Sequence, residues 1–349
     1  MICENRPPIR MKKTAKRIAF LGKMTLAVSI VFCTVAYGQD DRREAQRTVR
    51  AAASASETPG QPDERSFDQR CAAKGVLVCE GFDDPGAFLP ARYPASGLYP
   101  GSCSTCDFRD TSIKRSGASS YRMEIPGRTG ARPAGNWVQR FNHTFGEHST
   151  FYVSFSFRPD RNWLATDWER LMGTSPKIVI FHNYRGGTCA STEITTVNAG
   201  ARGYLTAYLE CGRRGLYTNE GTPPYLLEQG QYECWWSDNG GTGKCWYFHA
   251  EEWATLYYKI SIGTWGKPDS TVEAWVARQG RPMEKWIDLP KFVLQSDSAG
   301  YDALTLTQYM TNKDPKVDHP SAYVWYDDLI ISAGPIPPPN GPMPVSRVP

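Results

Sequence analysis

The sequence shows little helical periodicity, and this absence is the first constraint on the fold. In a chain of 349 residues, only Trp163–Leu171 has the pattern of a short surface helix. No internal repeat is found, and no apolar run has the length of a membrane span. A helical bundle and a repeat architecture are therefore disfavoured.

The N-terminus has the order of residues that is typical of an export signal. A stretch with seven Lys and Arg, opposed only by Glu4, precedes the apolar run Met24–Cys33, and small residues come just before Gln39. About a dozen apolar residues is short for a membrane anchor. We predict a cleaved signal peptide over residues 1–38, with Met11 as an equally good start, and a secreted or periplasmic bacterial protein that has no membrane contact after cleavage.

The charge of the mature chain does not favour nucleic acid as a partner. Residues 1–38 hold seven of the basic residues and one acidic residue, so their removal changes the formal net charge from +4 to −2. The basic character of the full chain therefore gives no indication of nucleic-acid binding.

Cysteines remain in an even number after cleavage, which in an exported chain favours disulfides over metal binding or catalysis. The eight are Cys71, Cys79, Cys103, Cys106, Cys189, Cys211, Cys234 and Cys245. We expect the pairs Cys189–Cys211 and Cys234–Cys245. The spacing of Cys103 and Cys106 also fits a redox motif or half a zinc site, but no second such pair supports either.

Composition divides the mature chain into three parts. Residues 39–70 are rich in charge, Ala, Ser and Pro without apolar periodicity, which predicts a disordered linker. Residues 334–349 are rich in Pro and are predicted to be a disordered tail. Residues 71–333 remain as one domain.

Alternation of apolar and polar residues dominates this domain. In Phe151–Phe157, for example, every second side chain is Phe or Val. Segments with one apolar face each require two packed sheets, so we predict an all-β antiparallel sandwich. The expected strands are Val76–Phe82, Ser120–Ile125, Trp137–Phe141, Phe151–Phe157, Lys177–His182, Tyr204–Glu210, Leu256–Ile262, Thr271–Ala277, Ala303–Met310 and Tyr323–Ile331.

The polar faces of several strands mix Tyr, Trp, Arg, Glu, Thr and Gln. Tyr204 and Tyr208, for example, share a face with Thr206 and Glu210. Aromatic rings stack on sugars and polar groups bind hydroxyls, so this composition favours a carbohydrate-binding groove. The alternative is that these aromatic residues only shield the sheet beneath loops.

Three stretches resemble the concanavalin A-like lectin/glucanase jelly-rolls, and within them the polysaccharide-lyase branch of heparin, alginate and glucuronan lyase type. They are Val76–Asp84, the pair Ile260–Trp265 and Ser270–Val276, and Tyr309–Asp314 followed by Tyr323–Ser332. The resemblance implies a two-sheet jelly-roll fold. It does not decide activity, because this superfamily includes lyases, hydrolases and proteins that only bind.

Hydrolases of this fold carry a Glu-x-Asp-x-(x)-Glu strand that places paired carboxylates on one face. That motif is absent. Glu193 and the pair Glu251 and Glu252 have the wrong spacing or neighbours, so a retaining glucanase is disfavoured.

The lyase resemblance implies a catalytic set. Tyr121–Ile125 resembles the Arg-x-Glu strand of these enzymes, with Arg122 as a catalytic and Glu124 as a substrate-binding residue. Ile180–His182 resembles their Gln-x-His strand, with His182 catalytic and Gln replaced by Ile. Tyr309 is the expected second proton-transfer residue.

Further substrate-binding residues are expected around this set: Arg140, Lys177, Tyr204, Tyr208, Tyr257, Lys259 and Lys313. The replacement of Gln by Ile180 removes one group that would neutralise a substrate carboxylate. Arg122, Arg140 or Lys177 would have to supply that charge.

A structural Ca²⁺ is implied by the resemblance alone, with Asp327, Asp328 and Glu80 as ligands. Hydrogen bonds that hold the terminal strands are the alternative role of these residues.

Two functions remain open. The first is a monomeric polysaccharide lyase that cleaves an acidic, uronate-containing glycan by β-elimination. The alternative is a non-catalytic glycan-binding or adhesion domain of the same fold.

Overall fold

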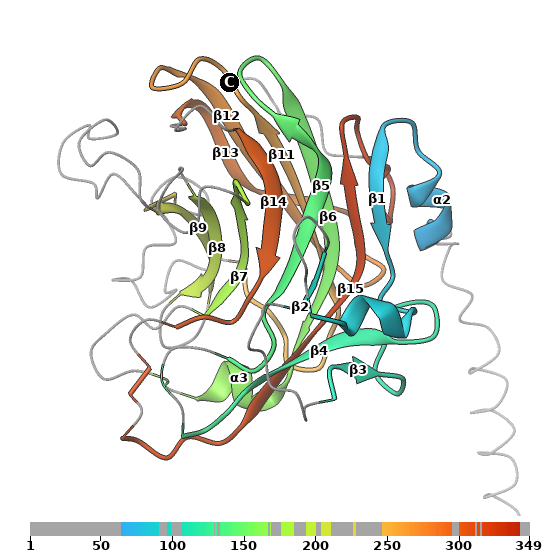
Figure 1. Ribbon diagram of the computed structural model, residues 1–349, viewed down its shortest axis with the longest axis vertical. Coiled ribbons are helices and arrows are strands. Elements are labelled where there is room, and N and C mark those ends of the chain that lie inside the picture. The colour runs from blue at the N-terminus through green and yellow to red at the C-terminus, as the bar shows by residue number, and fades with distance from the viewer. Residues whose placement is uncertain are drawn as a thin grey trace, which may run out of the picture. The chain divides into compact units, whose positions relative to one another are not determined.

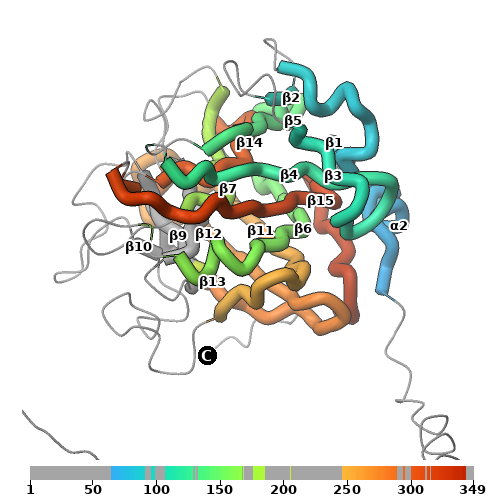
Figure 2. The backbone as a smooth tube through the Cα atoms, turned by 90° about the horizontal axis from the view of Figure 1, so that it is seen from below, coloured from blue at the N-terminus to red at the C-terminus, as the bar shows by residue number. Residues whose placement is uncertain are grey.

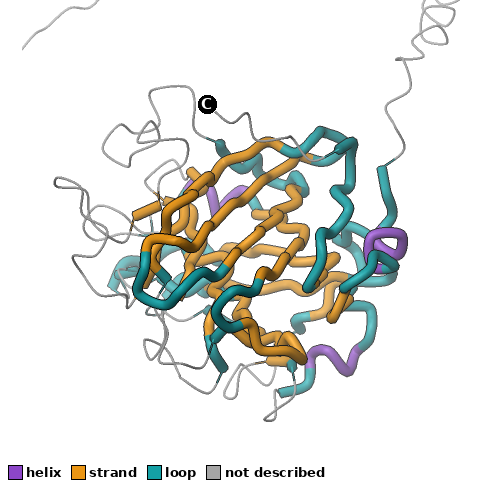
Figure 3. The backbone as a smooth tube through the Cα atoms, turned by 90° about the horizontal axis from the view of Figure 1, so that it is seen from above, coloured by secondary structure: helices purple, strands orange, loops and turns teal. Residues whose placement is uncertain are grey.

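The computed structural model describes residues 64–90, 96–98, 107–128, 130, 133–166, 168, 176–184, 193–199, 204–210, 226–227, 246–294, 300–310, 313–314 and 316–342. All of them belong to one compact unit, Gly60–Pro349. Strands dominate it (Figure 3). Among the described residues, no helix is long and apolar enough to cross a membrane.

Two antiparallel sheets face each other (Figure 1). The eight-stranded sheet has the order β13-β12-β11-β6-β15-β4-β3, and β1 pairs with β15 at one end of that long strand. Its strands are β1 (Val76–Glu80), β3 (Arg109–Asp110), β4 (Ser120–Ile125), β6 (Thr150–Pro159), β11 (Ala254–Ser261), β12 (Pro268–Arg278), β13 (Glu284–Val293) and β15 (Ala322–Ser332).

The seven-stranded sheet has the order β10-β9-β8-β7-β14-β5-β2. Its strands are β2 (Gly97–Leu98), β5 (Trp137–Phe145), β7 (Lys177–His182), β8 (Glu193–Ala199), β9 (Tyr204–Glu210), β10 (Leu226–Leu227) and β14 (Tyr301–Leu306). Three short helices complete the described elements: α2 (Phe67–Cys71), the 3-10 helix η1 (Pro85–Phe88) and α3 (Arg161–Ala165).

The core forms where the apolar faces of the two sheets meet. Phe181 of the seven-stranded sheet contacts Tyr258 of the eight-stranded sheet, with ring centroids 5.0 Å apart, and Phe151 lies 6.0 Å from Phe181. Tyr326 packs against Phe155 in the same cluster. Both sheets contribute side chains to this one interior. The predicted jelly-roll sandwich is confirmed, and Figure 2 shows the course of its backbone.

The predicted strands agree closely with the observed ones. Ser120–Ile125, Lys177–His182 and Tyr204–Glu210 match to the residue. The strands β8 and β13 were missed, as were the two-residue strands β2, β3 and β10. The expected helix at Trp163–Leu171 instead begins two residues earlier, because Asp160 caps it by accepting a hydrogen bond from the backbone N–H of Trp163.

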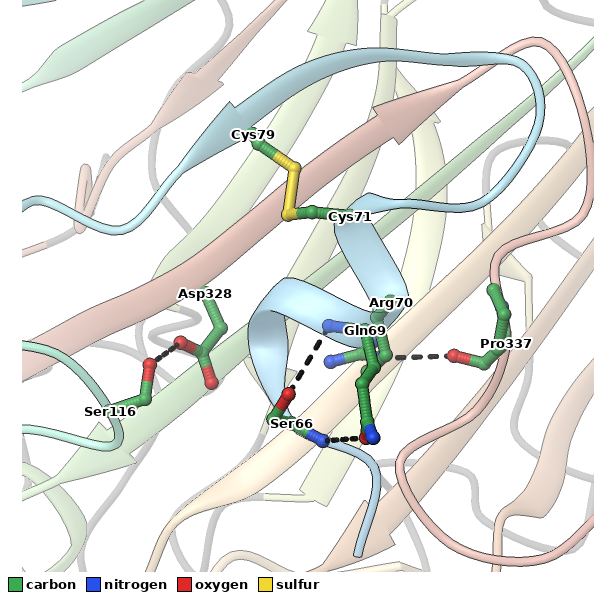
Figure 4. The surroundings of a disulfide bond; sticks show 8 residues. All are labelled: Ser66, Gln69, Arg70, Cys71, Cys79, Ser116, Asp328 and Pro337. Atoms are coloured by element: carbon green, nitrogen blue, oxygen red, sulfur yellow. Dashed lines mark hydrogen bonds between the residues drawn. A yellow bond between two sulfur atoms is a disulfide. The ribbon is translucent and has the colours of Figure 1, made fainter.

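The predicted limits of the ordered domain, residues 71 and 333, were wrong on both sides. Before residue 71, Ser66 and Gln69 form a capping box that starts α2 (Figure 4). After residue 333, Ile336 is only 1% exposed and packs into an apolar cluster on the outer face of the eight-stranded sheet. Arg70 donates to the carbonyl of Pro337, so the segment before β1 binds the segment after β15.

One disulfide, Cys71–Cys79, joins α2 to β1. The expected pairs Cys189–Cys211 and Cys234–Cys245 lie outside the described residues, as do Cys103 and Cys106.

Candidate functional site

The outer face of the seven-stranded sheet carries a row of polar side chains on β14 and the segment that follows it. Leu304 and Leu306 point into the core, whereas Ala303 packs in a separate cluster with Val138 on the other side of the sheet. The same alternation turns Thr305, and beyond the strand Thr307 and Tyr309, to the outer face.

Two predicted residues flank this row at one end. Ala303 pairs with Arg140 of β5 on one side and with His182 of β7 on the other. Neighbours in a cross-strand row point to the same face. Arg140 and His182 therefore lie close together on the outer face.

His182 is almost completely buried, with 7% of its surface exposed. Its Nδ1 lies 3.1 Å from the carbonyl oxygen of Asn183, which can only accept, so Nδ1 carries the hydrogen. Nε2 then accepts the hydroxyl hydrogen of Thr305 at 2.8 Å. Burial is the main cause that lowers the pKa of His182, so its imidazole is neutral at pH 7.

Arg140 is held by two neighbours that the sequence did not indicate as site residues. Its Nη2 donates to Oδ2 of Asp302 at 2.7 Å, and its guanidinium lies 4.4 Å from the ring centroid of Tyr184. Oδ1 of Asp302 accepts the backbone N–H of Tyr184 at 2.7 Å. Asp302 lies opposite a bulge in β5, where Asn142 adopts the left-handed backbone conformation that Asn tolerates.

A second polar group lies at the far end of the row. The Nζ of Lys177 is 5.2 Å from the ring centroid of Tyr309, and the backbone N–H of Lys177 donates to the carbonyl of Tyr309. Thr307 donates its hydroxyl to Oδ1 of Asn136 at 2.7 Å and accepts the backbone N–H of Tyr309 at 3.1 Å. Lys177 is buried, whereas Tyr309 is half-buried.

The two groups are separated along the sheet. Tyr309 comes six residues after Ala303, and six residues of extended chain span up to about 20 Å. Asp302 precedes Ala303 along β14 and binds the guanidinium of Arg140. The face therefore carries a cation next to a tyrosine at one end and an arginine next to an aspartate at the other.

Arg122 and Glu124 do not belong to this face. They lie on β4 of the other sheet, where Tyr121 and Met123 point into the core, so Arg122 and Glu124 point away from it. Arg122 donates to the carbonyl of Asp107 at 2.7 Å, and Glu124 accepts the hydroxyl of Ser321. The expectation that they share a site with His182 was wrong, because β4 joins β15 and not β14.

Tyr257 and Lys259 also lie on the outer face of the eight-stranded sheet. Tyr257 is buried beside Trp275, and its oxygen accepts the backbone N–H of Ile336. Burial raises the pKa of Tyr257 to about 12. Lys259 pairs with Glu273 at 2.6 Å. Both make structural contacts on that face, and the structure does not bring them together with His182.

The remaining expected substrate residues divide into two cases. Lys313 is buried, donates to the carbonyl of Pro126 and lies 5.7 Å from the ring centroid of Trp168, so it holds loops together. The side chains of Tyr204 and Tyr208 lie outside the described residues, although the backbone places Tyr208 opposite Thr195 in the seven-stranded sheet.

The residues expected to bind calcium are engaged in other contacts. Both carboxylate oxygens of Asp327 accept backbone N–H groups, from Arg115, Ser116 and Asp328. Asp328 accepts the hydroxyl of Ser116 (Figure 4).

Glu80 accepts the backbone N–H of Phe82. In the described part of the chain, no group of three or more His, Cys, Asp or Glu residues is arranged to hold a metal ion. The carboxylate oxygens of Asp327, Asp328 and Glu80 are therefore not arranged as a set of calcium ligands.

Comparison with known proteins gives a consistent set of similar structures. No protein-family model matches the chain, and no curated protein matches it. Among solved structures, an alginate lyase from Aplysia kurodai is 13% identical, with a TM-score of 0.44, and the match covers 64% of this chain and 86% of that one. An endo-β-1,4-glucuronan lyase from the fungus Trichoderma reesei is 14% identical, with a TM-score of 0.41 over 74% and 95% of the two chains.

An alginate lyase from Chlorella virus is 10% identical, with a TM-score of 0.39 over 64% and 89% of the chains. These similar structures are lyases of the branch that the sequence resembles. Identities and TM-scores of this size assign no activity, so the function is argued from the residues.

Proposed function

We propose that this protein is a polysaccharide lyase that cleaves a uronate-containing glycan by β-elimination on the outer face of the seven-stranded sheet. The observation that carries the proposal is the placement of Lys177 and Tyr309, where an ammonium group lies 5.2 Å from the ring of a half-buried tyrosine. The reaction needs a cation for the sugar carboxylate and a group that exchanges protons with the sugar.

Lys177 supplies the positive charge in this proposal. An ammonium paired with the carboxylate of the reacting sugar stabilises the negative charge that develops when the neighbouring C5 proton leaves. Lys177 thereby replaces the hydrogen bond to the carboxylate that is lost where Ile180 stands in place of Gln. Arg122 cannot supply it, because it lies on the opposite outer face.

Tyr309 carries the proton. As its phenolate it accepts the C5 proton, the C4–C5 double bond forms, and the C4–O bond breaks. The phenol then returns the proton to the leaving oxygen, so one residue serves both steps. His182 bonds to Thr305 and lies beside Arg140, several residues along the sheet, so it takes no part in proton transfer.

Export of the protein, by cleavage of residues 1–38, and its function as a monomer are part of the same proposal. An extracellular or periplasmic location fits a glycan substrate and the disulfide Cys71–Cys79.

The test is the ultraviolet absorbance of the unsaturated product. Purified protein is incubated with alginate, glucuronan, heparin and pectate, and we expect absorbance to rise with at least one of them. Tyr309→Phe and Lys177→Met should each abolish this rise while the melting temperature stays within a few degrees of that of the unchanged protein. No product from any acidic glycan would overturn the proposal.

Burial of Lys177 and His182 favours a second function, that of a glycan-binding domain without turnover. Only 5% of Lys177 is exposed, and Nε2 of His182 is already hydrogen-bonded. Glycan binding by a protein that yields no unsaturated product would establish this function.

A further inference from the structure

We propose that Arg140, Asp302 and Tyr184 form a second carboxylate-binding subsite, which holds a uronate unit of the glycan several sugars away from the one at Tyr309. This inference rests on the proposed function, since it concerns the same face and the same substrate. It assigns to Arg140 recognition of the chain and no part in the elimination.

The guanidinium of Arg140 is fixed before any ligand arrives. Asp302 binds Nη2, the ring of Tyr184 lies against the guanidinium plane, and Asp302 in turn fixes Tyr184 through its backbone N–H. The backbone N–H of Arg140 also donates to the hydroxyl of Ser96. A side chain held in this way loses little conformational entropy when it binds a ligand.

One donor of this guanidinium is left over. Nη1 of Arg140 is buried and has no hydrogen-bond partner among the described residues. Buried donors without a partner are rare and need an explanation. A carboxylate oxygen is the acceptor that would form the strongest hydrogen bond with Nη1, because donor and acceptor are both charged.

The charges around Arg140 limit how the subsite attracts its ligand. Asp302 balances the charge of Arg140, and His182 beside them is neutral at pH 7. The subsite therefore has almost no net charge, and its recognition depends on hydrogen-bond geometry more than on long-range attraction. Asp302 acts as a positioning residue.

The separation between Arg140 and Tyr309 along the sheet makes the subsite sensitive to the length of the substrate. Up to about 20 Å of extended chain separates Ala303, next to Arg140, from Tyr309. An oligosaccharide must be several sugars long to reach both ends. A short oligosaccharide cleaved at Tyr309 would not touch Arg140.

The experiment is a length series. Cleavage of uronate oligosaccharides, from the shortest that is cut up to the polymer, is measured for the unchanged protein, Arg140→Gln and the control Arg128→Gln, whose arginine forms an exposed ion pair with Asp318. We expect Arg140→Gln to lower kcat/KM at least tenfold on long substrates, mainly through KM, and to leave the shortest unaffected. Asp302→Asn should give the same pattern, and it replaces Arg140→Gln if that variant does not fold.

An equal loss on every length would place Arg140 at the reacting sugar and overturn the inference. No loss on any length would overturn it as well. If the unchanged protein cleaves nothing, the proposed function fails, and the same length series is measured as affinity by calorimetry. A loss of affinity confined to long oligosaccharides would then support the subsite, and its absence would overturn it.

Discussion

The two outer faces of the sandwich carry similar residues but use them differently. On the eight-stranded sheet, α2 and the segment after Ser332 pack over Tyr257 and Ile330, and Lys259 pairs with a carboxylate. On the seven-stranded sheet, a half-buried tyrosine lies next to a lysine, and an arginine keeps one donor without a partner. Tyr, Lys and Arg on an outer face therefore do not by themselves indicate a binding surface, because the chain covers Tyr257 and pairs Lys259 on the eight-stranded sheet.

The largest effect should follow removal of one hydroxyl from the seven-stranded face. Tyr309→Phe is expected to lower kcat by a factor of about 10² to 10⁴, the usual contribution of an acid–base group. The measurement is the initial rate of product absorbance at saturating glycan. Tyr323→Phe, a similarly half-buried tyrosine on the other face, is the matched control. Equal rates for both variants would remove Tyr309 from the mechanism.

A smaller side chain in the segment that covers the eight-stranded sheet should lower stability and leave turnover unchanged. Ile336 is 1% exposed, so Ile336→Ala is expected to lower the free energy of unfolding by about 2–5 kcal/mol. Urea denaturation measures the change, and Val317→Ala, at a residue that is 45% exposed, is the control. A loss of turnover at a temperature where the variant stays folded would mean that the two faces are coupled.

The disulfide that anchors α2 should have a smaller effect on the same face. Cys71 and Cys79 are eight residues apart, and a loop of this size stabilises a protein by about 2–3 kcal/mol. The double variant Cys71→Ala, Cys79→Ala should lose this amount in urea denaturation and keep its kcat/KM. An unchanged midpoint of denaturation would show that packing alone holds α2.

Titration of Asp327 should make stability depend on pH without a change in glycan affinity. Burial, and secondly the charge of Asp328, raise the pKa of Asp327 from 3.8 to about 8. Between these values the folded protein keeps a proton that the unfolded chain has lost. The free energy of unfolding therefore falls as pH rises, by at most about 1.4 kcal/mol per pH unit.

His182 changes the free energy of unfolding in the opposite direction. Because the pKa of folded His182 is lowered, the free energy of unfolding falls as the pH falls below 6.5, the ordinary pKa of histidine. Urea denaturation between pH 7 and 8 therefore reports mainly on the neighbouring carboxyls of Asp327 and Asp328, whose pKa values are both raised. The slope of stability against pH should be smaller in Asp327→Asn. An equal slope in both proteins would assign the dependence to another group.

Strand positions could be predicted from the sequence because alternation is a local property. The limits of β4, β7 and β9 were correct to the residue. In β4, Tyr121, Met123 and Ile125 face the core in alternation, whereas all six residues of β7 are buried. The packing of Ile336 could not be predicted, because one buried residue among prolines does not change the composition of the segment.

The site was only partly predictable for a related reason. Alternation shows that Arg122 and His182 both point away from the core, but not which sheet each strand joins. That depends on pairing between strands far apart in the sequence, such as β4 with β15 and β7 with β14. Asp302 gave no signal, because a bulge in the neighbouring strand places it next to Arg140.

The smallest effect should come from the residue that the sequence placed at the reacting sugar. Arg122 lies on the opposite outer face, over the ring of Tyr323 at 5.5 Å and bonded to the carbonyl of Asp107. Arg122→Ala should leave kcat/KM unchanged and lower the free energy of unfolding by at most about 1 kcal/mol, the usual contribution of a partly exposed cation–π contact. Rates on the full set of acidic glycans, measured beside Arg140→Gln, check this. A large loss of turnover in Arg122→Ala, with stability retained, would mean that the substrate binds the outer face of the eight-stranded sheet and not that of the seven-stranded sheet.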